Sequence, residues 1–555
     1  MKSFGNKWVE NLSPLLLGVL AFFIIIGPRA VYPTNIAWLG EGDPTTHYLG
    51  WLFFRNSEWS FPIGLNPTYG LELGNAILFS DSNPLLAFLF KPFASLLPEP
   101  FQYFGFWLLA CFVLQAWFGW KLAGLLSDST PIRVYSTGLF VFAPPMMWRL
   151  HGHLSLVGHF VILAALYLAL HSRLERRRLA WASLLATTAL VNAYLLAMVA
   201  LMWLADLGGK LIQRKVPLRK GTMELAAIVS VTGIVCWQAG YFTVGAGIGS
   251  FGFGFYRMNL LSILDASGWS HVWPDIPEGP GEYEGFNFLG LGVIFLVVCA
   301  IPAALTGSTE LLETIRRFPV LLVVLAGLVV FALSNNVGLG SLSYEYYLPY
   351  KIYVLASVFR SSGRMFWPVF YAIVFVVIFL IVRGNNTRTA VYLLGFALVI
   401  QIVDTSAAWK DIREKLMMEP TATWVTPMVD PFWEEAGAKY KKVRWIPPRS
   451  ESPKWLPIAA YAGTHGLATD AVYLARVGIL ALEQARRIAS NALKSGKYEA
   501  DSLYILDESV FRQAAVSLDP TTDVVARVDG FNVLAPGWKK CADCSRLADE
   551  VKAID

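Results

Sequence analysis

The sequence predicts a multispan α-helical membrane protein of about eleven spans that ends in a soluble α/β domain. The chain of 555 residues is 55% hydrophobic and only 15% charged, whereas a soluble domain is typically about a quarter charged. Apolar runs of about 17 to 25 residues recur along it, which is the length that a bilayer requires. We therefore divide it into a transmembrane domain over residues 1–405, with a large first outer loop at 31–100, and a soluble domain over residues 406–555.

The expected spans follow one another over most of the first domain. The first run comes after Lys2 and Lys7 and lacks a small-residue cleavage site, so we interpret it as a retained signal anchor. The eleven segments are 13–30, 101–122, 133–149, 155–172, 179–193, 194–212, 222–244, 286–305, 319–336, 366–383 and 389–405.

Basic residues indicate the orientation of these spans. The loops on the side of the N-terminus contain 17 Lys and Arg, whereas the longer loops on the opposite side contain 8. Because basic residues are retained on the cytoplasmic side, we expect a cytoplasmic N-terminus. The first outer loop and the C-terminal domain then lie on the other side of the membrane.

The C-terminal domain has an ordinary soluble composition. Residues 406–555 contain 40 of the 85 charged residues, 20 of each sign. Short strands at 443–447 and 502–507 flank a helical stretch at 475–495, which is typical of an α/β domain. Cys541 and Cys544 form a C-x-x-C pair, for which we expect a local disulfide, because the strand-to-helix context of a redox site is missing. No basic patch with interleaved aromatic residues is present, so we expect no nucleic-acid partner.

Two acids stand at the start of the first outer loop. Glu41 and Asp43 lie in a Gly-rich turn just after the first span, and an ionisable group at the membrane edge is by default a functional hypothesis. The alternative is that Asp43 caps a helix that begins with Pro44. Aromatic residues from Trp51 to Phe61 indicate an interfacial helix in this loop.

A second helix is expected further along the same loop. Asp81 is the expected N-cap of this helix, which ends near Lys91. Lys91 either extends to lipid headgroups or binds a lipid phosphate.

A basic cluster is expected at the start of the fourth span. Arg149, His151 and His153 lie at one membrane edge. The two histidines are separated by a single residue, which disfavours a helical two-His metal site, and no third ligand is evident. The functional interpretation is hydrogen bonding to a sugar or a phosphate, and the alternative is polar packing between short spans.

Two further motifs precede later spans. In the first, Glu284 lies between Tyr283 and Gly285, within about one turn of a span. A carboxylate beside an aromatic ring suits the binding of a sugar, through hydrogen bonds to its hydroxyls and stacking on its ring. The alternative is that Glu284 is a charge at the start of a helix that matches the helix dipole. In the second, Arg360 and Arg364 are spaced to share one helical face. Arginine's planar fork suits bidentate phosphate recognition, and the alternative is anchoring to bulk headgroups.

Together these segments resemble the C-type membrane glycosyltransferases, which have the GT-C fold and use polyprenyl-phosphate-linked sugars. An acid in the first outer loop and basic residues before a span are features of that superfamily. Residues 283–290 and 359–368 also look like a little-characterised bacterial membrane family near these enzymes. The resemblance implies a GT-C-like enzyme of the bacterial inner membrane, with its active site and C-terminal domain on the periplasmic side.

The resemblance also implies roles for individual residues. Asp43 or Glu41 would be the catalytic base, and a sugar would pass from the polyprenyl-phosphate donor to a hydroxyl of a glycan, lipid or protein acceptor. The donor phosphate would be bound by Arg360, Arg364 and Lys91. The sugar and acceptor would be bound by Arg149, His151, His153, Tyr283 and Glu284.

A glycosyltransferase of this kind requires no cofactor. The sequence contains no P-loop and no Gly-x-Gly-x-x-Gly unit, and a divalent metal is compatible with the many acids but not required. Two other functions are alternatives: a transporter or flippase of a lipid-linked glycan, which would place polar groups deep in the spans, and a polymerase or ligase of surface polysaccharide, which is also an outer-face enzyme. The absence of an evident internal repeat weakens the transporter alternative.

Overall fold

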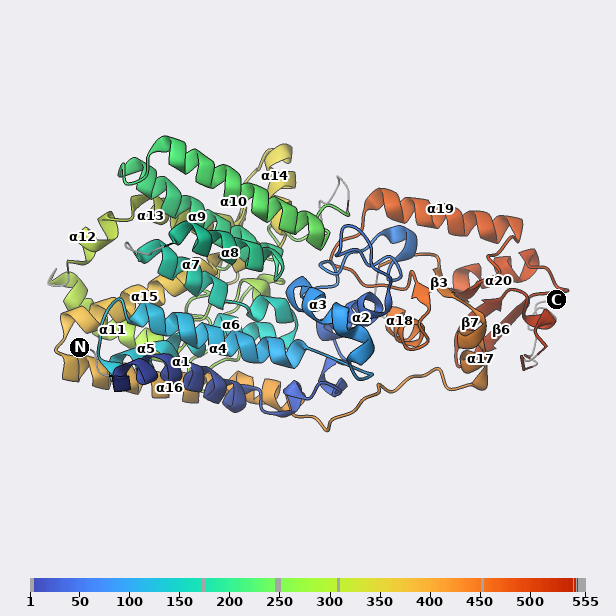
Figure 1. Cartoon of the computed structure of the whole chain (residues 1–555), viewed down its shortest axis with the longest axis horizontal. Coiled ribbons are helices and arrows are strands. Elements are labelled where there is room, and N and C mark those ends of the chain that lie inside the picture. The colour runs from blue at the N-terminus through green and yellow to red at the C-terminus, as the bar shows by residue number, and fades with distance from the viewer. Residues whose placement is uncertain are drawn as a thin grey trace. The chain divides into compact units, whose positions relative to one another are not determined.

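The structure is a computed structural model, and it describes residues 4–171, 176–244, 251–306, 310–450, 454–542, 544–545 and 547. The chain forms two compact units (Figure 1). Unit 1 comprises Met1–Trp38, Pro100–Val235 and Gly249–Ala422. Unit 2 comprises Leu39–Glu99, Cys236–Ile248 and Thr423–Asp555. The first outer loop is thus grouped with the C-terminal domain rather than with the helical bundle, which differs from the division expected from the sequence.

Unit 1 is a bundle of α-helices in which α1 and α4 pack side by side (Figure 1). Short 3-10 turns connect the helices, and one β-hairpin is present among the described residues. The helices are α1 (Phe4–Ile25), α4 (Phe104–Ala123), α5 (Thr130–Val141), α6 (Pro144–Trp148), α7 (Phe160–Leu170), α8 (Arg177–Ala189), α9 (Ala193–Ile212), α10 (Leu218–Ala239, whose last turn belongs to unit 2), α11 (Leu291–Leu305), α12 (Leu311–Arg316), α13 (Pro319–Leu333), α14 (Tyr350–Ala356), α15 (Trp367–Gly384) and α16 (Thr387–Leu416). The hairpin strands are β1 (Asn336–Leu339) and β2 (Leu342–Glu345).

Among the described residues, five helical segments are long and apolar enough to cross a membrane. They are Phe104–Ala123, Ala193–Ile212, Leu218–Ala239, Ser362–Gly384 and Thr387–Leu416. Each of the eleven expected segments contains a helix, but several helices, such as α5 with 12 residues and α7 with 11, are shorter than the roughly 20 residues that a span requires. The fold is therefore compatible with a membrane protein, and the number of eleven spans stays a prediction.

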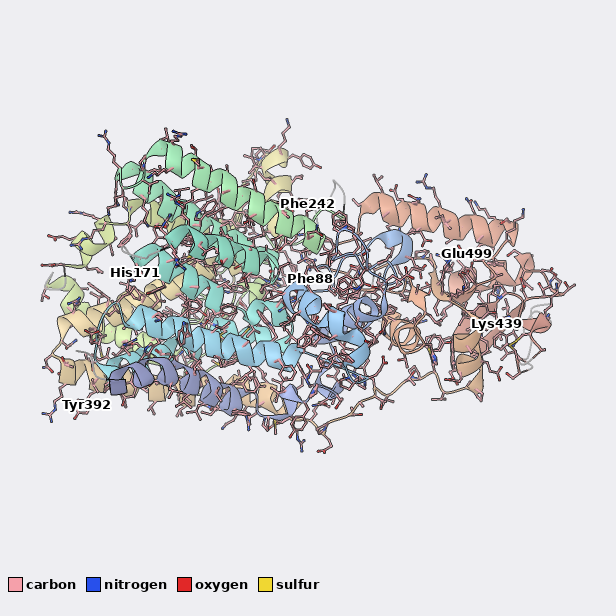
Figure 2. All side chains as sticks on the ribbon, viewed as in Figure 1. Phe88, His171, Phe242, Tyr392, Lys439 and Glu499 are labelled. Carbon is pink, nitrogen blue, oxygen red and sulfur yellow. A yellow bond between two sulfur atoms is a disulfide. The ribbon has the colours of Figure 1, made fainter. Side chains whose placement is uncertain are left out.

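Exposed apolar side chains support membrane association of the bundle. On α16, Tyr392, Phe396, Val399 and Val403 are each more than half exposed, and their spacing places them along one helical face. Figure 2 shows Tyr392 at the edge of the bundle. An exposed apolar stripe of this length is unusual on a soluble monomer, and it suits contact with lipid.

The expected span at 133–149 is wrong as a single helix. The chain leaves α5 at Val141, and α6 begins at Pro144. Proline disfavours a helical conformation at the residue before it, and Ala143 is accordingly extended. Arg149 lies beyond α6, in the 3-10 turn η5 (Arg149–His151).

Unit 2 contains a five-stranded sheet with strand order β4-β3-β5-β7-β6. Strand β3 pairs in parallel with β4 and β5, whereas β7 is antiparallel to β5 and β6. The sheet and its helices confirm a C-terminal domain with a sheet, and β3 and β5 lie where the sequence predicts strands. The elements are α17 (Pro431–Lys439), β3 (Lys442–Ile446), α18 (Trp455–Thr464), β4 (Ala468–Thr469), α19 (Ile479–Ser495), β5 (Ser502–Leu506), α20 (Glu508–Ser517), β6 (Val524–Val528) and β7 (Phe531–Ala535). Cys541 and Cys544 form the expected disulfide.

The first outer loop contributes helices to unit 2. They are α2 (Asp43–Asn56) and α3 (Pro84–Phe90), followed by the 3-10 helix η4 (Lys91–Leu96). The expectation that Trp51 and Phe54 belong to an interfacial helix is wrong, because both side chains are completely buried. The helix α2 packs against α3, η4 and α18, so it is a core element of unit 2.

Hydrogen bonds and an ion pair join this loop to the sheet. Gly70 N donates to Thr469 O at 2.7 Å, and Thr469 N donates to Thr68 O at 2.9 Å, so the loop covers the edge strand β4. Arg444 on β3 forms a two-pronged ion pair with Glu72 of the loop, at 2.9 and 3.0 Å. Arg444 also contacts Glu499 at 3.1 Å; Glu499 is labelled in Figure 2. These contacts explain why residues 39–99 group with the tail.

Candidate functional site

Two sequence motifs meet in unit 1, although they are about eighty residues apart. The 3-10 turn η7 (Glu282–Gly285) packs against the 3-10 turn η9 (Ser362–Phe366). A Cβ atom added at Gly363 would lie 2.5 Å from the Cα of Gly285, a distance that real Cβ atoms do not show. Asn287 Nδ2 donates to the carbonyl oxygens of Gly285 at 2.8 Å and Gly363 at 3.4 Å. The two glycines therefore allow the approach, and Asn287 fixes it.

This approach brings the carboxylate of Glu284 against two arginines. Arg364 donates from Nε to Oε2 at 2.9 Å and from Nη2 to Oε1 at 2.7 Å. Arg149 donates from Nη1 to Oε2 at 2.6 Å. His153 Nε2 lies 3.5 Å from Oε1. We call Arg149, His153, Glu284 and Arg364 the Glu284 cluster.

The Glu284 cluster combines burial with an excess of positive charge. Glu284, Arg149 and Arg364 are each less than 10% exposed. Burial opposes ionisation of Glu284, but Arg364 and Arg149 outweigh that effect and hold the pKa of the carboxyl well below its ordinary value. One carboxylate then faces two guanidinium groups, so a net positive charge remains. Such a site attracts an anion.

Aromatic rings flank both guanidinium groups. The Cζ of Arg364 lies 4.9 Å from the ring centre of Tyr194, and the Cζ of Arg149 lies 5.4 Å from that of Trp367. Tyr194 Oη also accepts a hydrogen bond from Ser361 N at 3.0 Å. Sequence reasoning did not select Tyr194. The sequence gives little reason to select Tyr194 as a site residue, because it lies in the first turn of α9, just after the capping residue Asn192.

The expectation that Arg360 and Arg364 project from one helical face is wrong. The helical turn ends before Ser361, whose φ and ψ are −90° and 71°, and η9 begins only after it. Arg364 is buried and paired with Glu284, whereas Arg360 is partly exposed. The Arg360 side chain forms no hydrogen bond or ion pair with the residues that the structure describes. The two arginines thus differ in environment, and Arg360 retains its full set of donors.

Two other expected residues border the Glu284 cluster in the sequence without joining its ion pairs. Tyr283 is 46% exposed, and burial together with the neighbouring Tyr256 raises the pKa of its phenol to about 12. It is therefore a neutral hydrogen-bond donor near neutral pH. His151 packs its ring against Trp148 and Trp269, at 5.2 and 6.3 Å between ring centres.

The family comparison places this cluster in a known sequence family. Residues 15–406 match the family described as a domain of unknown function, DUF6311. The chain belongs to the DUF6311 family. Residues 432–536 match the DUF6311 C-terminal domain, and no curated protein matches the chain. The two glycine-containing motifs and the Glu284 cluster all lie within the larger DUF6311 match.

The acids expected in catalysis lie in unit 2 of this DUF6311 protein. Helix α2 begins at Asp43, and its N-cap is Gly42, with φ of 68°. The alternative that Asp43 caps this helix is therefore wrong. Asp43 is partly exposed in the first turn, where an acid is favoured by the helix dipole, and Glu41 is exposed.

The position of Asp81 in the first outer loop also differs from expectation. Asn83, not Asp81, caps α3, because its Oδ1 accepts a hydrogen bond from Leu86 N at 3.4 Å. Asp81 instead lies 3.5 Å from His47 Nε2.

Lys91 does not extend to the surface. Its side chain is buried, and Nζ donates to Ser57 Oγ at 3.0 Å and to Glu58 O at 3.4 Å. The amino group also lies 4.0 Å from the ring centre of Phe54. Burial lowers its pKa to about 8. The alternative that Lys91 extends to headgroups is therefore wrong, and its role in binding the donor phosphate stays a prediction that these contacts weaken.

A polar cavity of about 320 Å³ lies close to η7 in unit 1. Glu282 of η7 pairs with Arg257, which lines the cavity, at 2.7 Å. Phe253, Asn335 and Tyr353 also line it, and Asn335 Oδ1 is buried without a hydrogen-bond partner among the described residues. Aromatic rings beside amide groups suit a sugar. Sequence reasoning missed this cavity, and the Asn335-Asn336 pair just after an apolar helix was its only signal.

Proposed function

We propose that the protein is a membrane glycosyltransferase that moves a sugar from a polyprenyl-phosphate donor to a hydroxyl of a periplasmic glycan, lipid or protein. The observation that carries the proposal is the Glu284 cluster. It is a buried, net positive site next to the apolar helix α15. A lipid phosphate combines an anion with an apolar chain, so its two parts match the two parts of this site.

Phosphate binding is assigned to Arg360 and to the arginines of the Glu284 cluster. Arg360 has no protein partner among the described residues, so its planar fork is available for two parallel hydrogen bonds to phosphate oxygens. Arg149 and Arg364 are held in place by Glu284 and give the Glu284 cluster its net positive charge. Glu284 is thus a positioning residue in this proposal rather than a group that contacts sugar hydroxyls.

The chemistry follows from the donor. An acceptor hydroxyl oxygen attacks the anomeric carbon of the sugar, and the bond from that carbon to the phosphate oxygen breaks. The electron pair stays on the departing polyprenyl phosphate, whose charge the arginines stabilise. The hydroxyl proton passes to a carboxylate, for which we propose Asp43, with Glu41 as the other acid of the same turn. Neither a cofactor nor a metal is needed to balance this step.

The polar cavity beside η7 is the proposed place for acceptor or sugar hydroxyl groups. Asn335 Oδ1 has no hydrogen-bond partner among the residues that the structure describes, and an unpaired buried acceptor is costly. A sugar hydroxyl would satisfy it while the rings of Phe253 and Tyr353 cover apolar C–H faces. His151, His153 and Tyr283 would contribute further donors from the neighbouring turns.

Phosphate binding by Arg360 can be tested directly. The affinity of the purified protein for polyprenyl phosphate would be measured by native mass spectrometry for Arg360→Gln and for Lys351→Gln. Lys351 is a matched control, because it is an exposed cation of unit 1 without a partner among the described residues. We expect Arg360→Gln to weaken binding about tenfold or more, and Lys351→Gln to leave it unchanged. Equal affinities in both variants and the parent would remove Arg360 from the donor site.

A further inference from the structure

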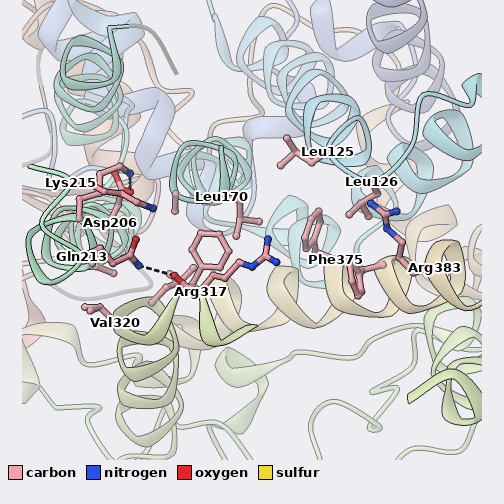
Figure 3. A pocket seen from close by; sticks show the side chains of 17 residues that line it. Leu125, Leu126, Leu170, Asp206, Gln213, Lys215, Arg317, Val320, Phe375 and Arg383 are labelled. Atoms are coloured by element: carbon pink, nitrogen blue, oxygen red, sulfur yellow. Dashed lines mark hydrogen bonds and ion pairs between the residues drawn. The ribbon is translucent and has the colours of Figure 1, made fainter. Parts of the chain in front are cut away.

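A second cavity of unit 1, of about 660 Å³, is formed at the ends of several helices. It is lined by residues near the C-terminal ends of α7, α9 and α15 and near the start of α13. None of its lining residues belongs to the Glu284 cluster or to the polar cavity beside η7. Figure 3 shows this cavity from close by.

One part of the cavity wall is apolar. Leu125, Leu170, Phe375 and Phe379 contribute aliphatic and aromatic side chains. Figure 3 shows Phe375 together with the charged side chains of Arg317 and Arg383 in the wall of this cavity. The wall therefore presents hydrocarbon directly beside positive charge.

The charges around the cavity do not cancel. Among the described residues that line it, the one acid is Asp206, which accepts hydrogen bonds from Arg177 Nε at 2.6 Å and from Trp181 Nε1 at 2.9 Å, and which is paired with Lys210. The charges of Asp206 and Lys210 therefore offset each other, so this pair adds no net charge to the cavity.

Three further cations line the cavity without such partners. The side chains of Lys215, Arg317 and Arg383 form no hydrogen bond or ion pair with the described part of the chain. The backbone carbonyl of Arg317 accepts a hydrogen bond from Gln213 Nε2 at 2.9 Å (Figure 3). The cavity therefore offers three free positive charges to a ligand.

The position of these cations along the chain fits a membrane boundary. Lys215 follows the apolar helix Ala193–Ile212, and Arg383 ends the apolar segment Ser362–Gly384. Phosphate headgroups lie where such apolar segments end. Simple anchoring to headgroups requires exposed cations but no cavity, and Arg316 and Arg388 are exposed cations near by in sequence that do not line this one.

We propose that this cavity binds one lipid molecule with an anionic phosphate headgroup. The phosphate is held by Arg317, Arg383 and Lys215, and part of an acyl chain lies against Leu170, Phe375 and Phe379. An arginine guanidinium can donate two parallel hydrogen bonds to phosphate oxygens. The apolar wall favours a lipid over a soluble anion as the ligand. By the charge distribution of the loops, this lipid belongs to the cytoplasmic leaflet.

The charge part of the proposal is tested by native mass spectrometry of the full chain with phosphatidylglycerol. The double variant Arg317→Gln/Arg383→Gln removes two lining cations, and Arg316→Gln/Arg388→Gln removes two neighbouring cations as a matched control. We expect the first variant to bind phosphatidylglycerol about tenfold to thirtyfold more weakly than the parent, with the control unchanged. Equal losses in both variants would show bulk headgroup attraction and overturn the proposal.

The cavity itself is tested without changing any charge. Gly209 lines it, and a Cβ added there meets open space, so Gly209→Leu should fill the cavity while α9 remains intact. Gly233→Leu is the control, because Gly233 also has open space but lies outside the cavity. We expect only Gly209→Leu to reduce phosphatidylglycerol binding, and unchanged binding in both would overturn the proposal.

Two ligand controls identify the source of the phosphate. Phosphatidylcholine has a similar apolar part but no net charge, and glycerol phosphate has the charge without acyl chains. We expect both to bind the parent more weakly than phosphatidylglycerol. Equal binding of phosphatidylcholine would refute headgroup recognition, and equal binding of glycerol phosphate would show a free-phosphate site instead of a lipid site.

Discussion

Replacing Glu284 with glutamine tests whether the Glu284 cluster organises unit 1. The variant keeps the shape of the side chain but removes the charge that two buried arginines face at 2.6 to 2.9 Å. Removing one partner of a buried ion pair typically costs about 3–5 kcal/mol, because the other charge is left uncompensated. We expect a loss of stability in that range.

This free energy corresponds to a measurable shift in melting temperature. Unit 1 has roughly 350 residues, and an unfolding entropy of about 2.1 cal/mol/K per residue gives about 0.7 kcal/mol/K. The expected decrease in Tm is therefore about 4–7 °C. Tryptophan fluorescence during heating of the detergent-solubilised protein measures it. Glu313→Gln, which changes an exposed carboxylate of α12, should leave Tm unchanged.

The pH dependence of this difference gives a second readout. The pKa of Glu284 is lowered in the folded state, so its stabilisation is complete above the ordinary value of about 4.3 and is lost only as pH falls through the lowered pKa. The Tm difference between parent and Glu284→Gln should thus stay constant from about pH 8 to about pH 5.5. The reasoning is refuted if Glu284→Gln melts with the parent, or if the difference disappears already near pH 6.

Three further outcomes are expected. Asp43→Asn should fold normally and lose about 10²–10⁴-fold in sugar-transfer rate, because an amide cannot take the hydroxyl proton; turnover at the parent rate would pass the role to Glu41. Gly363→Ala should force η7 and η9 apart, because its Cβ has no space beside Gly285, and should lower Tm and weaken polyprenyl phosphate binding together; unchanged values would contradict the close approach. Burial raises the pKa of Asp470 in unit 2 to about 7, so its protonated form favours folding and stability falls as pH rises from about 4 to about 7. Circular dichroism melts should show this slope in the parent and a flatter profile in Asp470→Asn; identical slopes would exclude Asp470 as the cause.

The sequence predicted local features better than long-range partners. Apolar runs located the helices, and alternating strands and helices located β3 and β5, because these patterns depend on neighbouring residues. The sequence also singled out Glu284 and Arg364 separately. It did not reveal that they form an ion pair, since the two residues come together only through the contact between Gly285 and Gly363.

The errors have the same origin. Aromatic composition predicts an interfacial position for the residues of α2, whereas packing against distant segments buries Trp51 and Phe54. Likewise, Arg360 and Arg364 have helical spacing, but the backbone at Ser361 breaks the helix between them. The resemblance to C-type glycosyltransferases concerns chemistry that the fold of the DUF6311 protein does not decide, and it stays a prediction.

The most direct test of the proposed function is the consumption of a lipid-linked sugar by the purified protein. Synthetic polyprenyl-phosphate sugars with a labelled sugar would be incubated with the reconstituted protein and a bacterial envelope extract as the source of acceptor. Mass spectrometry would then follow free polyprenyl phosphate and the labelled acceptor. The account predicts that both products accumulate together with at least one donor and that both are lost in Asp43→Asn. Donor that binds but is not consumed with any sugar tested, or that is only moved across the membrane intact, would contradict it.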